Sequence, residues 1–193
     1  MQPMLIETER TPNPATLKFL PGREVLGSGT REFTSPEDAE ASPLASALFS
    51  LGDVTGVFYG RDFISVKKAE GSADWQELKP LALGILVDHF ASGAPLFQGG
   101  GADAIDIAPD LPPDNPEDAD IVAQINDLIE TRIRPAVARD GGDIVYRGFD
   151  KGVVYLQMQG ACSGCPSSAM TLKQGIETLL KHYVPEVTDV RAL

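Results

Sequence analysis

An acidic segment rich in glycine and proline runs through the middle of the chain and separates it into two parts. From Gln98 to Pro116 it reads QGGGADAIDIAPDLPPDNP, with no basic residue and no regular spacing of apolar side chains. Its aspartates repel one another and its prolines stiffen the backbone, so an extended linker is expected. The chain of 193 residues is therefore expected to form two small domains, over residues 1–97 and 117–193, joined by a linker over residues 98–116.

Residues 1–97 have the pattern of a small α/β module. Short β-like runs are separated by turns, and two of them are joined across Gly60-Arg61-Asp62 with the spacing of a hairpin. Ser42 is a candidate N-cap for the first of two helices, and Pro80 can break the second helix in two. The expected strands are Met4–Thr8, Leu17–Leu20, Val54–Tyr59 and Phe63–Lys67, and the expected helices are Pro43–Leu51 and Asp74–Phe90.

Residues 117–193 predict the order α-β-β-α-(β). The first helix has one apolar face, Pro135 kinks or ends it, and Gly141-Gly142 stops it. Two strands then meet around Asp150-Lys151-Gly152, a strong hairpin signal. That apolar face comprises Ile121, Ile125, Leu128, Ile129 and Ile133, and the later elements are the strands Ile144–Phe149 and Val153–Met158, the helix Pro166–His182 and a possible last strand Val187–Val190. The expected domain is a small antiparallel sheet covered by two helices, and the chain as a whole has the fold class α/β (α+β).

Charge and composition narrow the classes of partner. A net charge of −12 argues against nucleic acid, because binding to phosphates depends largely on Lys and Arg. No apolar run reaches the roughly 18–20 residues of a membrane-spanning helix, so no membrane partner is expected. Residues 1–10 have no basic start followed by an apolar run, unlike a signal peptide, and Glu7 and Glu9 precede the first Arg, unlike a transit peptide. A bacterial cytoplasm is the expected location, and the mitochondrial matrix is the alternative for a processed chain.

The two cysteines of the chain lie in one short segment, GACSGCPSS, between a predicted strand and a predicted helix. Pro166 favours a helix start, which puts Cys165 at or next to the N-cap and Cys162 in the loop just ahead. The free N–H groups and the helix dipole there favour the thiolate, which is the species that binds soft metals. Small neighbours let the loop wrap closely around a ligand. Cys162 and Cys165 are therefore the candidate metal and cofactor ligands.

A C-x-x-C pair admits several interpretations. A thiol–disulfide oxidoreductase would use the pair as a redox couple, although the βαβ pattern usual for that class is absent. A zinc site needs four ligands, and His182 lies about 25 Å along the helix from Cys165, so zinc would require two chains. An iron–sulfur cluster also takes four thiolates, which a homodimer can supply to a bridging [4Fe–4S] or [2Fe–2S] cluster. Two structural cysteines that happen to lie close together are the remaining alternative.

The run ARDGGDIVYRGFDKGVVYLQMQGACSGCPSSAMTLKQGIETLL, residues 138–180, closely resembles the C-terminal domain of NifU-like (Nfu-type) iron–sulfur cluster scaffold and carrier proteins. The segment RTPNPATLKFLPG, residues 10–22, resembles the Nfu N-terminal domain found with it in one branch of that family. The resemblance implies that Cys162 and Cys165 bind a cluster, [4Fe–4S] being favoured. It also implies a carrier rather than an enzyme, which transfers the cluster to apo-proteins. The expected partners are a second copy of the chain, apo iron–sulfur clients and an upstream cluster scaffold, and the N-terminal domain is the expected client-docking module.

Two further motifs are interpreted as structural. Asp140 and Asp143 flank Gly141-Gly142, where they are expected to shape a helix-to-strand turn rather than to act as acid and base. The TPNP run, residues 11–14, is expected to be a rigid turn that fixes two strands, with partner recognition as the alternative.

Overall fold

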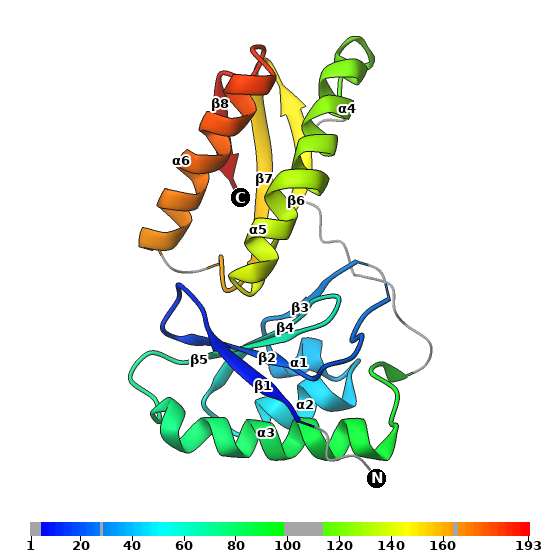
Figure 1. Ribbon diagram of the computed structural model, residues 1–193, viewed down its shortest axis with the longest axis vertical. Coiled ribbons are helices and arrows are strands. Elements are labelled where there is room, and N and C mark those ends of the chain that lie inside the picture. The colour runs from blue at the N-terminus through cyan, green and yellow to red at the C-terminus, as the bar shows by residue number, and fades with distance from the viewer. Residues whose placement is uncertain (1–4, 28, 99–113, 164–165) are drawn as a thin grey trace. The chain divides into compact units, whose positions relative to one another are not determined.

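The structure is a computed structural model that describes residues 5–27, 29–98, 114–163 and 166–193, apart from the side chains of residues 166–168. The chain divides into two compact units, residues 1–105 and 106–193, each with helices and a sheet (Figure 1). The expected two-domain α/β (α+β) fold is confirmed. The predicted linker lies mostly outside the described residues, so its boundaries stay a prediction.

The described part of the N-terminal unit contains a five-stranded antiparallel sheet with the order β1-β2-β5-β4-β3 (Figure 1). The other expected strands and the helices are present, but the strand expected over Met4–Thr8 begins only at Glu7 and runs to Arg10. The third strand and the shortest helix are additions to the predicted set. The strands are β1 (Glu7–Arg10), β2 (Thr16–Leu20), β3 (Arg31–Phe33), β4 (Val54–Tyr59) and β5 (Ile64–Lys68), and the helices are α1 (Pro36–Ala39), α2 (Pro43–Phe49) and α3 (Trp75–Ser92).

The core of this unit lies between one face of the sheet and the helices. Alternate residues of the central strands, such as Phe19 and Val66, are buried on this face together with Leu44 of α2 and Leu86 of α3. The expected cap at Ser42 is confirmed, since its hydroxyl accepts a hydrogen bond from the Ala45 N–H at 3.3 Å. The same hydroxyl lies 2.8 Å from the buried Tyr59 hydroxyl, and burial raises the pKa of Tyr59.

Pro80 does not break the long helix of this unit. Helix α3 runs without interruption from Trp75 to Ser92 with Pro80 inside it. An internal proline removes one helical hydrogen bond and costs about 3 kcal/mol. Leu78, Ala82 and Leu86 on both sides of it are fully buried, and their packing outweighs that cost.

The TPNP run is a rigid turn, as predicted. The Thr11 hydroxyl donates to the backbone oxygens of Asn13 at 2.8 Å and Thr16 at 3.0 Å. The buried Asn13 side chain accepts from the Ala15 N–H at 3.0 Å. The Trp75 indole N–H donates to the Pro14 oxygen at 3.0 Å, which ties the start of α3 to this turn.

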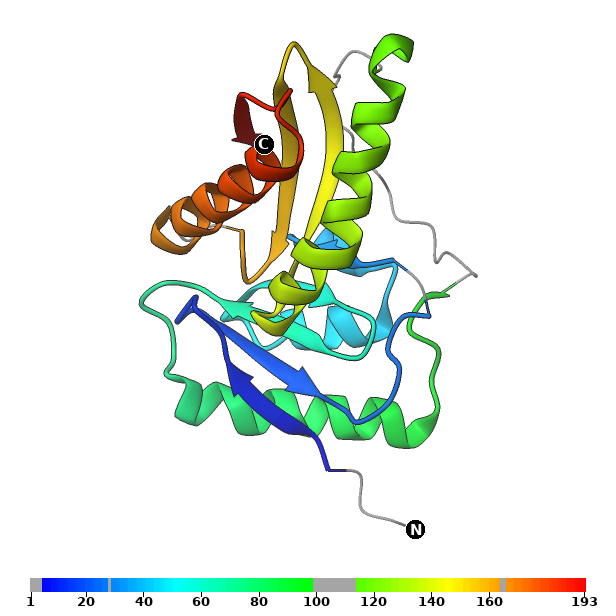
Figure 2. The same cartoon turned by 45° about the horizontal axis from the view of Figure 1, so that its top comes forward.

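The described part of the C-terminal unit contains a three-stranded sheet with two helical segments on one face (Figures 1 and 2). Strands β6 and β7 are antiparallel as predicted, but β7 and β8 are parallel, so the expectation of an all-antiparallel sheet was wrong. The long helix α6 carries the chain back along the hairpin, which makes the parallel pairing possible. The elements are η2 (Pro116–Asp118), α4 (Ala119–Leu128), η3 (Ile129–Ile133), α5 (Arg134–Arg139), β6 (Gly142–Asp150), β7 (Val153–Gly160), α6 (Pro166–Tyr183) and β8 (Asp189–Ala192).

The first helix of this unit passes through a π-helical turn. Apolar residues recur every four positions from Ile121 to Val137, and at about 100° per residue each step overshoots a full turn by about 40°. The wider turn η3 absorbs this drift, so Ile125, Ile129 and Ile133 all remain buried. Pro135 is the second residue after this turn, and the helix continues to Arg139 instead of ending at the proline.

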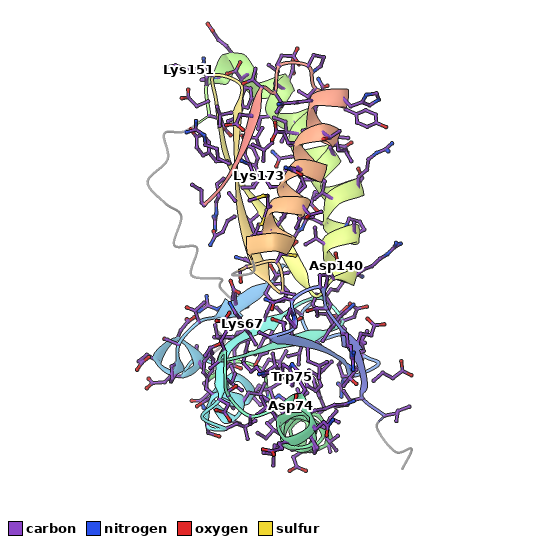
Figure 3. The ribbon with its side chains drawn as sticks, turned by 90° about the vertical axis from the view of Figure 1, so that its left-hand side faces the viewer. Lys67, Asp74, Trp75, Asp140, Lys151 and Lys173 are labelled. Carbon is purple, nitrogen blue, oxygen red and sulfur yellow. The ribbon has the colours of Figure 1, made fainter. Side chains whose placement is uncertain are left out.

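The β6–β7 hairpin turns at Lys151 and Gly152, which have φ angles of 49° and 84°. Two central residues with positive φ form the tight turn that suits the twist of a two-stranded ribbon. Figure 3 shows Lys151 at this tip of the hairpin and Asp140 near its opposite end. The predicted hairpin is confirmed, and both strands extend beyond the predicted limits.

Asp114 anchors the start of this unit to the outer strand of its sheet. One of its carboxylate oxygens accepts hydrogen bonds from the Phe149 N–H at 2.8 Å and the Tyr146 hydroxyl at 2.9 Å. Burial and the neighbouring Asp114 carboxylate raise the pKa of Tyr146. Asp114 was predicted to be part of the extended linker, yet its side chain satisfies a backbone N–H beside the bulge of β6.

Among the residues that the structure describes, no helix combines the length and the apolar character that crossing a membrane requires.

Candidate functional site

Cys162 lies two residues beyond the end of β7, in the loop where it was predicted. Its side chain is only 5% exposed and belongs to the apolar core of the C-terminal unit, together with Ile144 and Met158. Helix α6 begins at Pro166, as predicted. Cys165 lies outside the described residues, so its role as a ligand stays a prediction.

The backbone around Cys162 forms a tight turn. The Ser163 N–H and the Ser163 hydroxyl both donate to the Gly160 oxygen, at 3.1 and 2.8 Å. Gly160 has a φ of 66°, which a residue with a side chain adopts only with strain. The Ala161 N–H donates to the Gly141 oxygen at 3.1 Å, so the cysteine loop is bonded directly to the DGGD turn.

Gly142 borders the sulfur of Cys162. It is the first residue of β6 and pairs with Gly160, the last residue of β7. A methyl group at Gly142 would lie 2.7 Å from the Cys162 Sγ and 2.5 Å from the Gln159 backbone oxygen. The second glycine of DGGD therefore leaves the space that the sulfur occupies.

Asp143, the last residue of the DGGD segment, forms a partly buried ion pair with Arg134. The guanidinium donates from Nε to Oδ1 at 2.8 Å and from its terminal nitrogen to Oδ2 at 2.6 Å. Arg134 also donates to Glu130 at 2.6 Å, and these carboxylates, Asp143 first, raise the pKa of Arg134. The side chain of Asp143 is 5% exposed and that of Arg134 is 30% exposed. Two parallel hydrogen bonds fix α5 against the start of β6.

Sequence reasoning placed both aspartates of DGGD in the turn and missed Arg134. At Asp140 the expectation holds, because its N–H donates to the Val137 oxygen at 3.0 Å where the helix ends. Asp143 instead lies in the strand and pairs with Arg134. Because a buried carboxylate needs a cation, the basic residues of the preceding helix could have indicated this ion pair from the sequence.

The described residues, which exclude Cys165, contain no group of three or more His, Cys, Asp or Glu side chains placed to hold a metal ion. Cys162 offers a soft sulfur donor. Hydrogen bonds to the Gly141 and Gly160 oxygens hold the backbone on either side of it, and its neighbours in the sequence have small side chains. A thiolate there suits zinc or an iron–sulfur cluster rather than hard cations such as Mg²⁺ or Ca²⁺.

Comparison with known proteins matches each of the two units to a protein family. Residues 125–191 match the NifU-like domain family, and residues 6–93 match the family described as scaffold protein Nfu/NifU N terminal. The human protein named NFU1 iron-sulfur cluster scaffold homolog, mitochondrial, is 46% identical over 187 residues, which are 97% of this chain and 71% of the human protein. The chain belongs to the Nfu/NifU family. The resemblance noted in both halves of the sequence is thereby confirmed.

A plant relative and a solved structure are also similar to this chain. NifU-like protein 5, mitochondrial, from Arabidopsis thaliana is 49% identical over 189 residues, which are 97% of this chain and 67% of the plant protein. The solution structure of a NifU-like protein from Saccharomyces cerevisiae is 26% identical, with a TM-score of 0.46 over 51% of this chain and 88% of that one. The human and plant names agree with the mitochondrial alternative, and nothing found supports the expected bacterial cytoplasm.

Proposed function

We propose that this chain is an iron–sulfur cluster scaffold and carrier that binds a cluster between two copies and passes it to apo-proteins. The observation that carries the proposal is the C-x-x-C pair, Cys162 and Cys165, within a NifU-like domain. The human relative is named as an iron–sulfur cluster scaffold. The cluster is cargo in this proposal, not a resident cofactor.

The ligand count supports a homodimer. The chain contains two cysteines, and the common clusters take four thiolates. Two copies that meet at their C-x-x-C loops supply four, and a two-fold axis gives both copies the same contacts. We favour [4Fe–4S] over [2Fe–2S] as the shared cluster. A cluster held only at an interface becomes accessible to other thiolates whenever that interface opens.

The residues of the site have separate roles in the proposed mechanism. The thiolates of Cys162 and Cys165 bind iron, and a client's thiolates replace them one at a time. In this ligand exchange one Fe–S bond forms as another breaks, and no net electron transfer occurs. Because the Cys162 sulfur is buried in the single chain, binding to a shared cluster requires its side chain or its loop to turn outward.

The N-terminal unit is proposed to dock client proteins, and an upstream scaffold is proposed to load the carrier. This assignment rests on the match of residues 6–93 to the Nfu/NifU N-terminal family. Pull-down of apo-clients by the whole chain and by a chain that lacks residues 1–97 tests it. Equal capture by both chains would contradict the docking role. Fractionation of the source cells would decide between the cytoplasm and the mitochondrial matrix.

The central experiment is anaerobic reconstitution with iron and sulfide, followed by metal analysis, a visible spectrum and the mass in solution. We expect about four irons and four sulfides per two chains, with both lost in Cys162→Ser and in Cys165→Ser. Ser163→Ala is the control, because it changes the same loop without removing a thiol. About two irons per two chains would show that the shared cluster is [2Fe–2S] rather than [4Fe–4S].

Two other outcomes would contradict the carrier function. A colourless monomer whose two thiols cycle reversibly with a defined potential would establish the thiol–disulfide oxidoreductase instead. A colourless dimer loaded with zinc would identify a structural metal site. Transfer is tested by mixing the loaded carrier with an apo-protein in the presence of an iron chelator. Loss of the cluster to the chelator rather than to the apo-protein would exclude direct exchange.

A further inference from the structure

The start of β6 closes around the sulfur of Cys162 in the unloaded chain. We propose that Gly142 is a positioning residue that provides the resting position of this sulfur and shields it from reagents until a cluster is loaded. The inference deepens the proposed function, but its central measurement uses the apo-chain and does not depend on a cluster.

The geometry leaves no room for a side chain at Gly142. An added methyl carbon would lie 2.7 Å from the Cys162 Sγ, 3.1 Å from the Cys162 N and 2.5 Å from the Gln159 oxygen. Carbon contacts this short lie well inside the optimal separation of about 3.5–4.0 Å. The overlap with the sulfur is relieved when the Cys162 side chain turns away, whereas the overlap with the Gln159 oxygen is relieved only by a shift of the backbone.

Side-chain and backbone hydrogen bonds hold this part of β6 in place. Asp143, the next residue of β6, is fixed by its two hydrogen bonds to Arg134, at 2.8 and 2.6 Å. On the other side Gly142 is paired with Gly160 in the sheet. The Cys162 side chain turns about a single bond and lies beyond the last residue of β7. A methyl group at Gly142 should therefore displace the sulfur outward.

The other end of the same hairpin provides a matched control. A methyl group at Gly152 would lie 2.7 Å from the Thr188 Oγ1 and 3.0 Å from the Glu186 oxygen. This overlap resembles the one at Gly142, but it lies at the hairpin tip, where Figure 3 labels Lys151, away from the end near Asp140. Gly152 also has a φ of 84°, so Gly152→Ala strains the same hairpin through its backbone as well as by overlap, without touching Cys162.

The test measures alkylation of Cys162 by iodoacetamide in the apo-chain that carries Cys165→Ser, where Cys162 is the remaining thiol. We expect Gly142→Ala to accelerate the reaction about tenfold, equivalent to about 1.4 kcal/mol in the equilibrium that exposes the sulfur. Gly152→Ala should leave the rate near that of the parent. Equal rates in the two glycine variants would overturn the proposal.

A second measurement covers the case in which Gly142→Ala does not fold. Urea unfolding is compared for Gly142→Ala in the native background and in a Cys162→Ala background. If the methyl group displaces the sulfur, Gly142→Ala should cost less stability in the Cys162→Ala background than in the native background, or should fold only there. If the loss is the same, or neither chain folds, the overlap with the Gln159 oxygen explains the effect and the positioning role is wrong.

The two proposals can fail separately. If the native chain binds no cluster but Gly142→Ala is alkylated faster, the carrier function is wrong and the resting position of the sulfur is supported. If the native chain binds a cluster but Gly142→Ala is alkylated no faster than Gly152→Ala, the carrier function is supported and the resting position is wrong.

Discussion

The sheet of the N-terminal unit is buried against large aromatic and aliphatic side chains, whereas the sheet of the C-terminal unit ends, beside Cys162, in glycines and an ion pair. In the first, Phe33 packs edge-on against Tyr59 with ring centres 5.2 Å apart. In the second, Gly142 borders the sulfur, and Asp143 is held by Arg134. Both sheets pack on an apolar core, but next to the sulfur the contacts are of a different kind.

The contacts in the N-terminal unit stabilise its fold, whereas the contacts beside Cys162 affect access to the sulfur. Large apolar groups give the N-terminal unit a core that no proposed chemistry needs to open. At the end of the C-terminal unit that carries Cys162, directional hydrogen bonds fix the backbone, and Gly142 leaves the space that the buried sulfur occupies. In the proposed function, a site that admits a cluster and then releases it would benefit from this arrangement. Substitutions in the two units should therefore affect different measurements.

The largest effect is expected for a core truncation in the N-terminal unit. Leu86 is 0% exposed, and Leu86→Ala should lower the free energy of unfolding of this unit by about 2–5 kcal/mol, because it leaves a cavity. Trp75 is the single tryptophan and is bonded to the β1–β2 turn, so its fluorescence during urea unfolding reports on this unit. Leu81→Ala, on the same helix but 56% exposed, is the control and should change stability by less than about 0.5 kcal/mol. An equal loss of stability in the C-terminal unit would show that the two units unfold together.

A smaller effect is expected when the ion pair of the C-terminal unit is broken. Asp143→Asn should lower the stability of that unit by about 2–3 kcal/mol, because Arg134 loses its main partner while remaining partly buried. Far-UV circular dichroism during urea unfolding measures the loss, and the Trp75 signal should not change. Glu177→Gln breaks the exposed pair with Lys181 on α6 and should cost less than about 1 kcal/mol. Similar losses in the two variants would mean that Arg134 contributes no more than a surface pair.

The smallest effect is a pH dependence confined to the N-terminal unit. Burial lowers the pKa of His89 in the folded chain, so the unfolded chain binds more protons as the pH falls. The contribution of His89 to stability is complete above the unfolded pKa of about 6.5 and decreases as the pH falls through the window below it. We expect the urea midpoint from Trp75 fluorescence to fall between pH 7.5 and pH 5.5. His89→Gln should reduce this fall, and an unchanged fall would assign it to other groups.

Much of the fold could be predicted because it depends on local patterns. The hairpin at Lys151-Gly152, the cap at Ser42 and the start of α6 at Pro166 follow from residue preferences for turns and helix ends. The position of Cys162 in a loop after a strand followed from the same signals. Local chemistry decides these features, so one sequence is enough to identify them.

The features that were missed depend on contacts between distant residues. Burial of Leu78 and Leu86 carries α3 through Pro80, although proline alone predicts a break. The parallel pairing of β7 with β8 depends on where α6 delivers the chain. Neither the contact of Gly142 with the Cys162 sulfur nor the bonds of Asp114 to β6 can be read from spacing, because each joins segments that meet only in the folded chain.

The π-helical turn η3 has a consequence for how this segment tolerates change in its length. Arg134 follows directly after the turn, so the direction of Arg134 relative to the buried apolar face depends on the rotation that the wider turn takes up. A π-helical turn holds one more residue than an α-helical turn between the same flanking segments, so loss of one residue within η3 should convert it to an α-helical turn and keep the two segments in phase. Loss of one residue elsewhere in this helix would rotate the segments on either side by about 100° relative to each other. The helix can therefore be shortened by one residue at η3 without turning Arg134 away from Asp143, and not at its other turns.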